Sequence, residues 1–199
     1  LLMKQRLGLF EDPFTPDNYK YPLVASDSFI NHSYEIAGEA ITLLKNANAT
    51  LPISQDKKLF VTGPMANSLT MINGSWGRTW QGTDEQWDDT SKHTILDAIE
   101  ANFTEVSFEQ GCDISHPTQY KKAYNKARNS DVIIACMGEY PSTEKPGDIH
   151  SLNLEEAQIE YVKGLAKLGK PIVLVLVENR ARVIREIEPL CESIVLAYQ

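Results

Sequence analysis

The 199-residue sequence is poor in cysteine and contains no long apolar run. Its three cysteines, Cys112, Cys136 and Cys191, lie far apart and form no pair with the spacing of a zinc or redox motif. A membrane-spanning helix needs about 20 consecutive apolar residues, whereas the apolar stretches here are only as long as buried strands. We therefore expect neither a cysteine-based metal site nor a membrane span.

Basic residues are also scarce, because 19 Lys and Arg stand against 27 Asp and Glu, which leaves a formal net charge of −8. This balance disfavours a nucleic-acid partner, since phosphate contacts require clustered Lys and Arg. The four histidines form no ligand pair with one another. We expect no metal and no cofactor, and we assign the histidines to surface or capping positions.

Several motifs of common enzyme chemistry are missing as well. No Gly-x-Gly-x-x-Gly follows the first predicted strand and no Walker loop occurs, which argues against dinucleotide and nucleotide phosphates. No nucleophile elbow precedes a predicted helix, so a serine hydrolase triad would lack its serine.

Apolar periodicity predicts strands that alternate with helices. The domain opens with a helix that has N-cap oxygens from Ser26 onwards and an apolar face running to Leu44. A later helix has Asn153 and Glu156 as a capping-box pair and Gly169 just after its end. Five strands are expected, at residues 57–62, 106–108, 132–137, 172–177 and 194–197.

This alternation indicates a mainly parallel sheet covered on both faces, a flavodoxin-like three-layer α/β/α sandwich. In the strand order 2-1-3-4-5, the first and third predicted strands are neighbours and the ligand crevice lies at their carboxyl ends. The loop after the first strand, residues 65–93, carries three tryptophans, and the loop after the third strand is rich in charge. The two least regular stretches should therefore meet across one crevice.

The predicted crevice would hold indole faces, Arg78 and the carboxylates of Glu139, Glu144 and Asp148. Aromatic platforms beside carboxylates suit sugars, which stack their C–H faces on rings while acids transfer protons. Glycoside hydrolysis needs two carboxyl groups on opposite sides of the scissile bond. Two structural alternatives remain open: the charged loop could be a solvated turn, and the tryptophans could cover the edges of the core.

Five segments, in order along the chain, resemble glycoside hydrolase family 3, the β-glucosidases and related exo-acting β-glycosidases. They are Leu-Gly-Leu-Phe-Glu-Asp-Pro at 7–13, Ala-Ile-Thr-Leu-Leu-Lys-Asn at 40–46 with Leu51-Pro52, Gly-Pro-Met-Ala-Asn at 63–67, Gly-Ser-Trp-Gly-Arg-Thr-Trp-Gln-Gly at 74–82, and Gly-Glu-Tyr-Pro-Ser-Thr-Glu-Lys-Pro-Gly-Asp at 138–148. The resemblance implies an α/β-sandwich domain that supplies a loop to an active site on a neighbouring (β/α)₈ barrel.

By motif position, the resemblance assigns the general acid/base role to Glu144, with Glu139 as the rival and Lys145 and Asp148 as supporting charges of the loop. It assigns sugar stacking to Trp80, with Arg78 nearby as a second substrate-binding residue. We expect Trp76 and Trp87 to be packing residues instead. The family's nucleophile is an Asp in the barrel, in a motif similar to Ser-Asp-Trp, which this sequence does not contain.

The implied domains are residues 1–22, the end of the barrel with a linker at Pro13, Pro16 and Pro22, and residues 23–199, the sandwich, which we expect to be truncated at its C-terminus. The chain starts without an initiator Met or a signal peptide, and we interpret it as a fragment or a processed product that hydrolyses nothing alone. The implied partners are the barrel and a β-glucoside or β-glucan oligosaccharide.

The resemblance favours a periplasmic or secreted protein. The Asn-x-Ser/Thr sequons at Asn31, Asn48, Asn73 and Asn102 matter only if the protein is a secreted eukaryotic one. The alternative from a different class is a non-catalytic flavodoxin-like or receiver-like module that binds a ligand or a partner. A receiver would need acidic residues at the ends of its first and third strands, and here the first strand ends in Gly63-Pro64.

Overall fold

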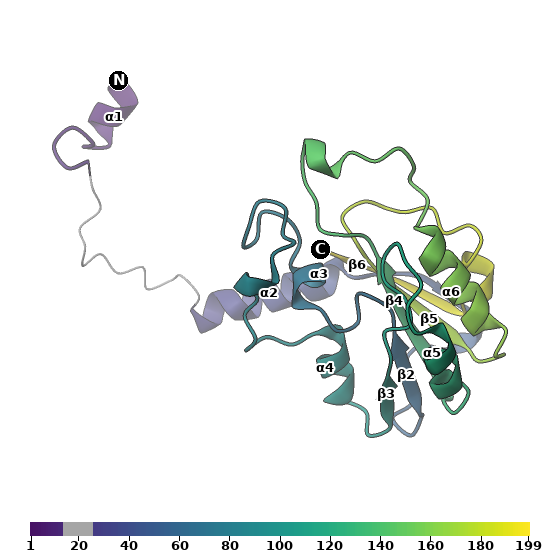
Figure 1. The fold of residues 1–199 in the computed structure, drawn as a ribbon. Coiled ribbons are helices and arrows are strands. Elements are labelled where there is room, and N and C mark those ends of the chain that lie inside the picture. Colours follow the sequence, from purple (N-terminus) through teal and green to yellow (C-terminus); the bar gives the residue numbers. More distant parts are fainter. Residues whose placement is uncertain (14–25) are drawn as a thin grey trace. The chain divides into compact units, whose positions relative to one another are not determined.

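A computed structural model describes residues 1–13 and 26–199 (Figure 1). The chain divides into two compact units, residues 1–39 and 40–199, which are described separately. The expected linker prolines Pro16 and Pro22, and the expected domain boundary after residue 22, lie outside the described residues.

The first unit contains helix α1, Leu2–Arg6, and nearly all of helix α2, Asp27–Ala40. After α1 the backbone enters the left-handed region at Gly8, where φ is +71°. A glycine adopts this conformation without the steric penalty of a Cβ atom, so the chain can leave the helix at this point.

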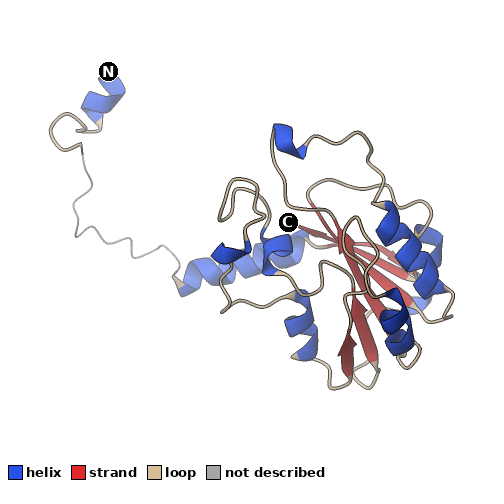
Figure 2. Cartoon of the chain, in the orientation of Figure 1, coloured by secondary structure: helices blue, strands red, loops and turns tan. Residues whose placement is uncertain are grey.

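The second unit contains a six-stranded sheet in the order β1-β6-β5-β4-β2-β3 (Figure 2). The strands are β1 (Thr42–Asn46), β2 (Leu59–Thr62), β3 (Val106–Phe108), β4 (Val132–Gly138), β5 (Ile172–Glu178) and β6 (Ser193–Tyr198). The α-helices are α3 (Leu69–Asn73), α4 (Ile95–Glu100), α5 (Tyr120–Ala127) and α6 (Glu156–Ala166). Single 3₁₀ turns lie at Ala47–Ala49, Glu85–Trp87, Lys145–Gly147 and Glu188–Leu190.

The five expected strands are β2 to β6, and their order confirms the predicted flavodoxin-like arrangement. Strand β2 lies between β3 and β4 and pairs in parallel with both. Strands β4, β5 and β6 continue the parallel sheet. The carboxyl ends of β2 and β4 are therefore adjacent, as a crevice between their following loops requires.

The first predicted helix is wrong beyond Ala40, because the chain forms strand β1 there instead. β1 pairs antiparallel with β6, so that Thr42 lies opposite Leu196 and Asn46 opposite Ser193. The apolar residues of this segment fit a helical period as well as a strand. The open edge of β6 decides between the two, because pairing satisfies backbone groups that an unpaired edge would leave exposed.

Two hydrophobic clusters lie on opposite faces of the sheet, because alternate residues of β2, β4 and β5 belong to different clusters. In β4, Ile133, Ala135 and Met137 belong to the cluster under α5 and α6, and the intervening residues belong to the cluster that includes Leu96 of α4. In Figure 1, α4 lies on one side of β2 and β3, with α5 and α6 on the other. This is the predicted three-layer sandwich.

A stack of tyrosines joins α5 and α6 to the sheet. The ring of Tyr161 stacks on those of Tyr120 and Tyr124, with centroids 4.9 and 5.5 Å away. The Tyr161 hydroxyl lies 2.5 Å from the hydroxyl of Thr62 at the end of β2. A Cβ atom at Gly111 would come within 2.0 Å of the Tyr161 Oη atom, so only glycine fits there.

The capping box expected for α6 is absent. The helix begins at Glu156 after an N-cap residue, Glu155, whose side chain makes no cap bond, and Asn153 instead forms an isolated β-bridge with Val183. A capping box occurs at α4, between Thr94 and Asp97. Gly169 follows α6 with φ of +66°, as expected of a residue that terminates a helix.

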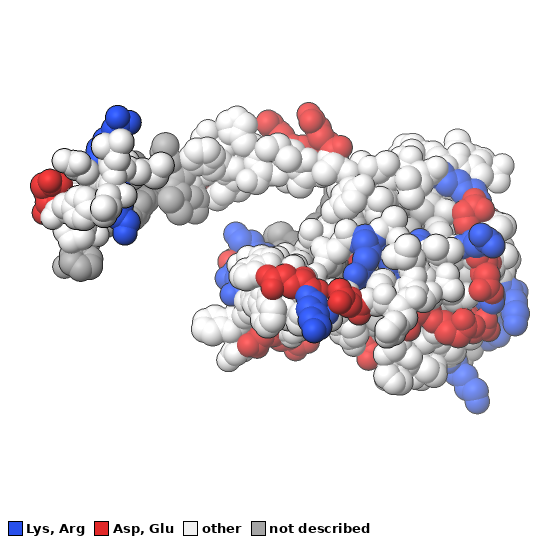
Figure 3. Space-filling model, turned by 90° about the horizontal axis from the view of Figure 1, so that it is seen from above, with Lys and Arg blue, Asp and Glu red and all other residues white. Residues whose placement is uncertain are grey.

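On the face seen in Figure 3, Lys and Arg side chains are interspersed with Asp and Glu rather than gathered into a basic patch. Within the described residues, no helix combines the length and the apolar character needed to cross a bilayer.

Candidate functional site

The loop after β2, residues 65–93, is called the tryptophan loop here, and the loop after β4, residues 139–148, the charged loop. They meet at the carboxyl edge of the sheet. The side-chain amide of Gln81 donates to the Thr143 carbonyl oxygen at 3.1 Å and accepts from the Thr143 N–H at 3.1 Å. An added Cβ atom at Gly82 would lie 3.1 Å from the Pro141 Cβ atom. The predicted meeting of the two irregular loops is confirmed.

Glu139 is the buried anchor of the charged loop, with only 5% of its surface exposed. One carboxylate oxygen accepts hydrogen bonds from the backbone N–H groups of Asn179 and Arg180, at 3.2 and 3.1 Å. The other accepts from Arg180 Nε at 3.0 Å and from Arg182 at 3.2 Å. With four donors around it, this carboxylate is engaged in holding the loop on the end of β5.

Arg180 extends this hold to two further points of the charged loop. Its guanidinium donates to the Gly147 carbonyl oxygen at 2.7 Å and to the Ser142 hydroxyl at 3.3 Å. The neighbouring Asn179 side chain donates to the Ser142 carbonyl oxygen at 3.2 Å. The loop is therefore fastened on both sides of its tip, from the end of β5 and from the tryptophan loop.

Glu144 lies at the tip between these points and is exposed to solvent. Its carboxylate makes no hydrogen bond or ion pair with any part of the chain that the structure describes. Its backbone has φ of +53° and ψ of −153°, a conformation that is unfavourable for a residue with a Cβ atom. Residues held in such conformations cluster at functional sites, where surrounding contacts over-determine them.

Lys145 begins the 3₁₀ turn Lys145–Gly147 directly after Glu144, Asp148 directly follows this turn, and both side chains are exposed. The Gly147 N–H donates to the Glu144 carbonyl oxygen at 2.9 Å, and the Asp148 N–H donates to the Lys145 carbonyl oxygen at 3.1 Å. The turn thus shapes the tip through its backbone. Among the described residues, no ion pair joins Glu144 to Lys145.

Trp80 is half-exposed, with 47% of its surface open, so it is not a residue of the domain core. The expectation that Trp76 and Trp87 are packing residues is wrong, because their exposed fractions, 65% and 53%, exceed that of Trp80. Trp76 has φ of +60°, and its N–H donates to the Trp80 carbonyl oxygen at 3.1 Å, which closes a turn over residues 76–80. Arg78, within this turn, forms a surface ion pair with Asp89 at 3.8 Å.

The side chain of Gln199 adds another link at the carboxyl edge. Its amide nitrogen donates to the Met71 carbonyl oxygen of α3 at 2.9 Å and to the Glu139 carbonyl oxygen at 2.8 Å. The end of the β6 segment therefore ties the tryptophan loop to the start of the charged loop.

Beneath the charged loop, Glu178 ends β5 and is almost completely buried, with 2% exposure. One of its oxygens accepts from the Arg182 N–H at 3.2 Å, and the other has no hydrogen-bond partner among the described residues. Burial, together with the nearby negative charge of Glu139, raises the pKa of Glu178 to about 7. Glu178 faces the anchor and not the exposed tip.

No sequence pattern had assigned a role to Gln81, Asn179, Arg180, Arg182 or Gln199. The position of Asn179 and Arg180 was a usable signal, since they directly follow a doubly buried strand that neighbours β4. Gln81 and Gln199 carried no such signal, because their partners lie 62 and 60 residues away along the chain.

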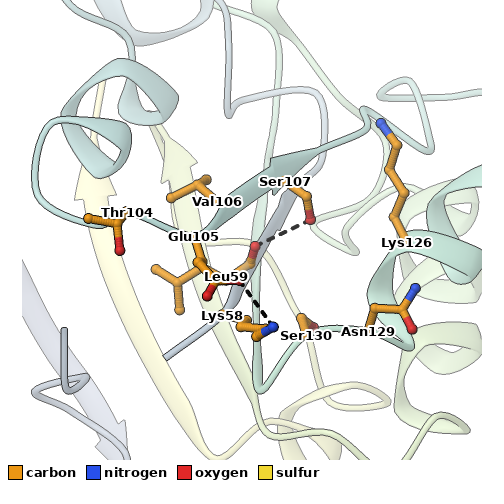
Figure 4. Close-up of a pocket in the computed structure, with 9 residues that line it drawn as sticks. All are labelled: Lys58, Leu59, Thr104, Glu105, Val106, Ser107, Lys126, Asn129 and Ser130. Carbon is orange, nitrogen blue, oxygen red and sulfur yellow. Dashed lines mark hydrogen bonds and ion pairs between the residues drawn. The ribbon is translucent and has the colours of Figure 1, made fainter. Parts of the chain in front are cut away.

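A hollow of about 410 Å³ lies at the opposite, amino edge of the sheet (Figure 4). Its lining includes Lys58 and Glu105, which form an ion pair at 3.1 Å between exposed side chains. None of the residues singled out from the sequence lines it. Within the described residues, no group of three His, Cys, Asp or Glu side chains is arranged to hold a metal ion.

Comparison with known proteins agrees with this architecture. The chain is 32% identical, over its full length, to a lysosomal beta glucosidase of Dictyostelium discoideum, of which it covers 26%. It is 28% identical over 90% of its length to a beta-xylosidase of Formosa agariphila, covering 26% of that protein, and 27% identical over 90% of its length to a periplasmic beta-glucosidase of Salmonella typhimurium, covering 27%. The chain thus spans about a quarter of the length of these relatives.

The same fold occurs in solved structures. The crystal structure of a beta-glucosidase from Listeria innocua in complex with isofagomine superposes with a TM-score of 0.85, at 22% identity, over 99% of this chain and 27% of that one. Residues 41–199 match the glycosyl hydrolase family 3 C-terminal domain. The chain therefore belongs to glycoside hydrolase family 3, and residues 41–199 correspond to its C-terminal domain.

Proposed function

We propose that this chain is part of a retaining, exo-acting β-glycosidase that hydrolyses terminal β-linked glucosyl residues. In this proposal residues 23–199 form the sandwich domain, and residues 1–22 are the end of a preceding (β/α)₈ barrel with its linker. The family membership and the coverage of about a quarter of each relative support a larger enzyme. The choice of glucose rests on relatives named as beta glucosidases, although one relative is named a beta-xylosidase.

The difference in exposure between the two candidate carboxylates supports the catalytic assignment. Glu144 is exposed at the tip of a loop that is fastened on both sides, whereas Glu139 is buried under four donors. A general acid must reach the glycosidic oxygen of a bound sugar. Glu144 can do so without disturbing the fold, and Glu139 cannot.

In the proposed mechanism, Glu144 protonates the leaving oxygen while a nucleophile attacks the anomeric carbon. The resemblance supplies an Asp of the barrel as this nucleophile, which lies outside the present chain. Retaining enzymes hold the two carboxyl groups about 5–5.5 Å apart and form a covalent glycosyl-enzyme. Glu144 then removes a proton from the water that hydrolyses this intermediate.

Trp80 and Arg78 are the proposed substrate-binding residues of this domain. The half-exposed indole of Trp80 offers a face on which a sugar ring can stack. Arg78 lies two residues away, and its exposed guanidinium can donate to sugar hydroxyls, since its ion pair with Asp89 is long and solvated. Lys145 and Asp148 shape the tip that presents Glu144.

The test compares leaving groups in the full-length protein that contains this chain. Glu144→Gln should reduce kcat/KM for substrates with poor leaving groups by roughly 10²–10⁴-fold. For activated aryl β-glucosides, which need little protonation, kcat/KM should fall far less. Glu156→Gln, an exposed carboxylate in the first turn of α6, is the matched control. Equal losses on both substrate classes would contradict the assignment of Glu144.

A further inference from the structure

Gln81 lies at the contact between the two halves of the candidate site. It directly follows Trp80, and its side chain bonds to Thr143, the residue directly before Glu144. Both bonds are 3.1 Å long and use both groups of the amide, one as donor and one as acceptor. The Gln81 side chain thus pairs with the Thr143 backbone as a neighbouring strand would.

This pairing fixes the peptide group that leads into Glu144. The Thr143 carbonyl oxygen belongs to the same planar peptide unit as the Glu144 nitrogen, so the bond from Gln81 Nε2 sets the orientation of that plane. The Glu144 backbone that follows this peptide plane has φ of +53°, a value that the Cβ atom of Glu144 disfavours. Without an external hold, the tip would relax towards a negative φ and carry the carboxylate to a different position.

The backbone beside Gln81 also makes close contacts. Gly82, the next residue, has φ of +75°, and an added Cβ atom there would lie 2.2 Å from the Gly74 carbonyl oxygen. The backbone next to Gln81 therefore packs closely against the Gly74 end of the same loop. On the other side of the tip, Arg180 donates to the Gly147 carbonyl oxygen. Gln81 and Arg180 therefore restrain the loop on both sides of Glu144.

We propose that Gln81 is a positioning residue that sets the place of the Glu144 carboxylate relative to a sugar stacked on Trp80. The inference rests on the function proposed above, because it assumes that Glu144 is the general acid/base. Because Trp80 and Gln81 are consecutive residues, one short segment of the tryptophan loop carries both the proposed stacking surface and the side chain that bonds next to Glu144. Gln81 makes no contact with the reacting atoms in this scheme.

The first experiment measures Gln81→Ala in the full-length protein with a series of aryl β-glucosides of different leaving-group pKa. Misplacing a catalytic group by about 1 Å can cost about 10²-fold, so kcat/KM for poor leaving groups should fall roughly 10–100-fold. Activated substrates should change by less than about threefold, since they need little help from the acid.

Two further variants separate positioning from a general effect on the loop. Gln81→Glu keeps the length and can still accept from the Thr143 N–H, but it sets an oxygen against the Thr143 carbonyl, so it should not restore the rate on poor leaving groups. Gln86→Ala is the control, because Gln86 lies in the same loop, is exposed, and bonds only to Asp84 among the described residues. Thermal unfolding of each variant shows whether the protein remains folded.

A double-mutant cycle decides the outcome. In the Glu144→Gln background, Gln81→Ala should cause little further loss, because no acid remains to be positioned. A further 10–100-fold loss there, or a loss that is equal for all leaving groups, would overturn the inference while leaving the role of Glu144 intact. If Glu144→Gln itself shows no dependence on the leaving group, the proposed function fails and the role of Gln81 fails with it.

Discussion

Replacing Glu178 by Gln should make the chain more stable at pH 8 and leave it nearly unchanged at pH 4. Glu178 is almost fully buried at the end of β5, beneath the anchor formed by Glu139 and the two arginines. Its partners are few, since one oxygen accepts only from the Arg182 N–H and the other has no partner within the described residues. Gln keeps the shape and the acceptor but carries no charge.

The magnitude follows from the raised pKa. Burial, with a contribution from Glu139, raises the pKa of Glu178 from 4.5 to about 7. Between these values the folded state binds more protons than the unfolded state, so stability falls as the pH rises through this window. At about 1.4 kcal/mol per pH unit, ionised Glu178 lowers the free energy of unfolding by about 3 kcal/mol above pH 7.

The assay is urea unfolding of the 199-residue chain, followed by tryptophan fluorescence at several pH values between 4 and 8. The difference in unfolding free energy between Glu178→Gln and the parent chain should grow from near zero to about 3 kcal/mol across this range. Glu100→Gln, at the exposed end of α4, is the matched control and should show no such trend. A difference that does not vary with pH would refute the reasoning.

Three further predictions follow from the contacts. Gly111→Ala should destabilise the chain by about 2–4 kcal/mol, since the new methyl group would clash with the Tyr161 hydroxyl at a positive φ. Gly169→Ala, at a similar φ with no atom within 4 Å, should cost only about 1 kcal/mol in the same unfolding assay, and equal costs would contradict the clash. Glu139→Ala should cost about 3–5 kcal/mol, because it leaves the buried Arg182 without its closest carboxylate; a near-neutral result would show that the anchor is dispensable. The isolated 199-residue chain should not hydrolyse an activated aryl β-glucoside, and turnover that Glu144→Gln abolishes would reveal a complete site within it.

Much of the fold could be predicted from local sequence patterns. The doubly buried runs of β4 and β5 and the position of Gly169 after α6 depend on neighbouring residues only, so their signals survive in the sequence. The flavodoxin-like strand order was one of the common orders for a doubly wound parallel sheet, and it brought the loops after β2 and β4 together. Strand β1 could not be predicted in this way, because its apolar spacing also suits a helix and the open edge of β6 decided its conformation.

For the candidate site, the sequence by itself identified the two loops, the carboxylates Glu139 and Glu144, and the indole of Trp80. Only the tertiary structure distinguished the two carboxylates, because burial and hydrogen-bond partners depend on residues from other strands. Arg180 reaches Glu139 across 41 residues of sequence, and Gln81 reaches Thr143 across 62. Such polar contacts leave no periodic trace in a sequence, since one side chain satisfies one distant partner, and they become visible only when the sheet brings the ends of its strands together.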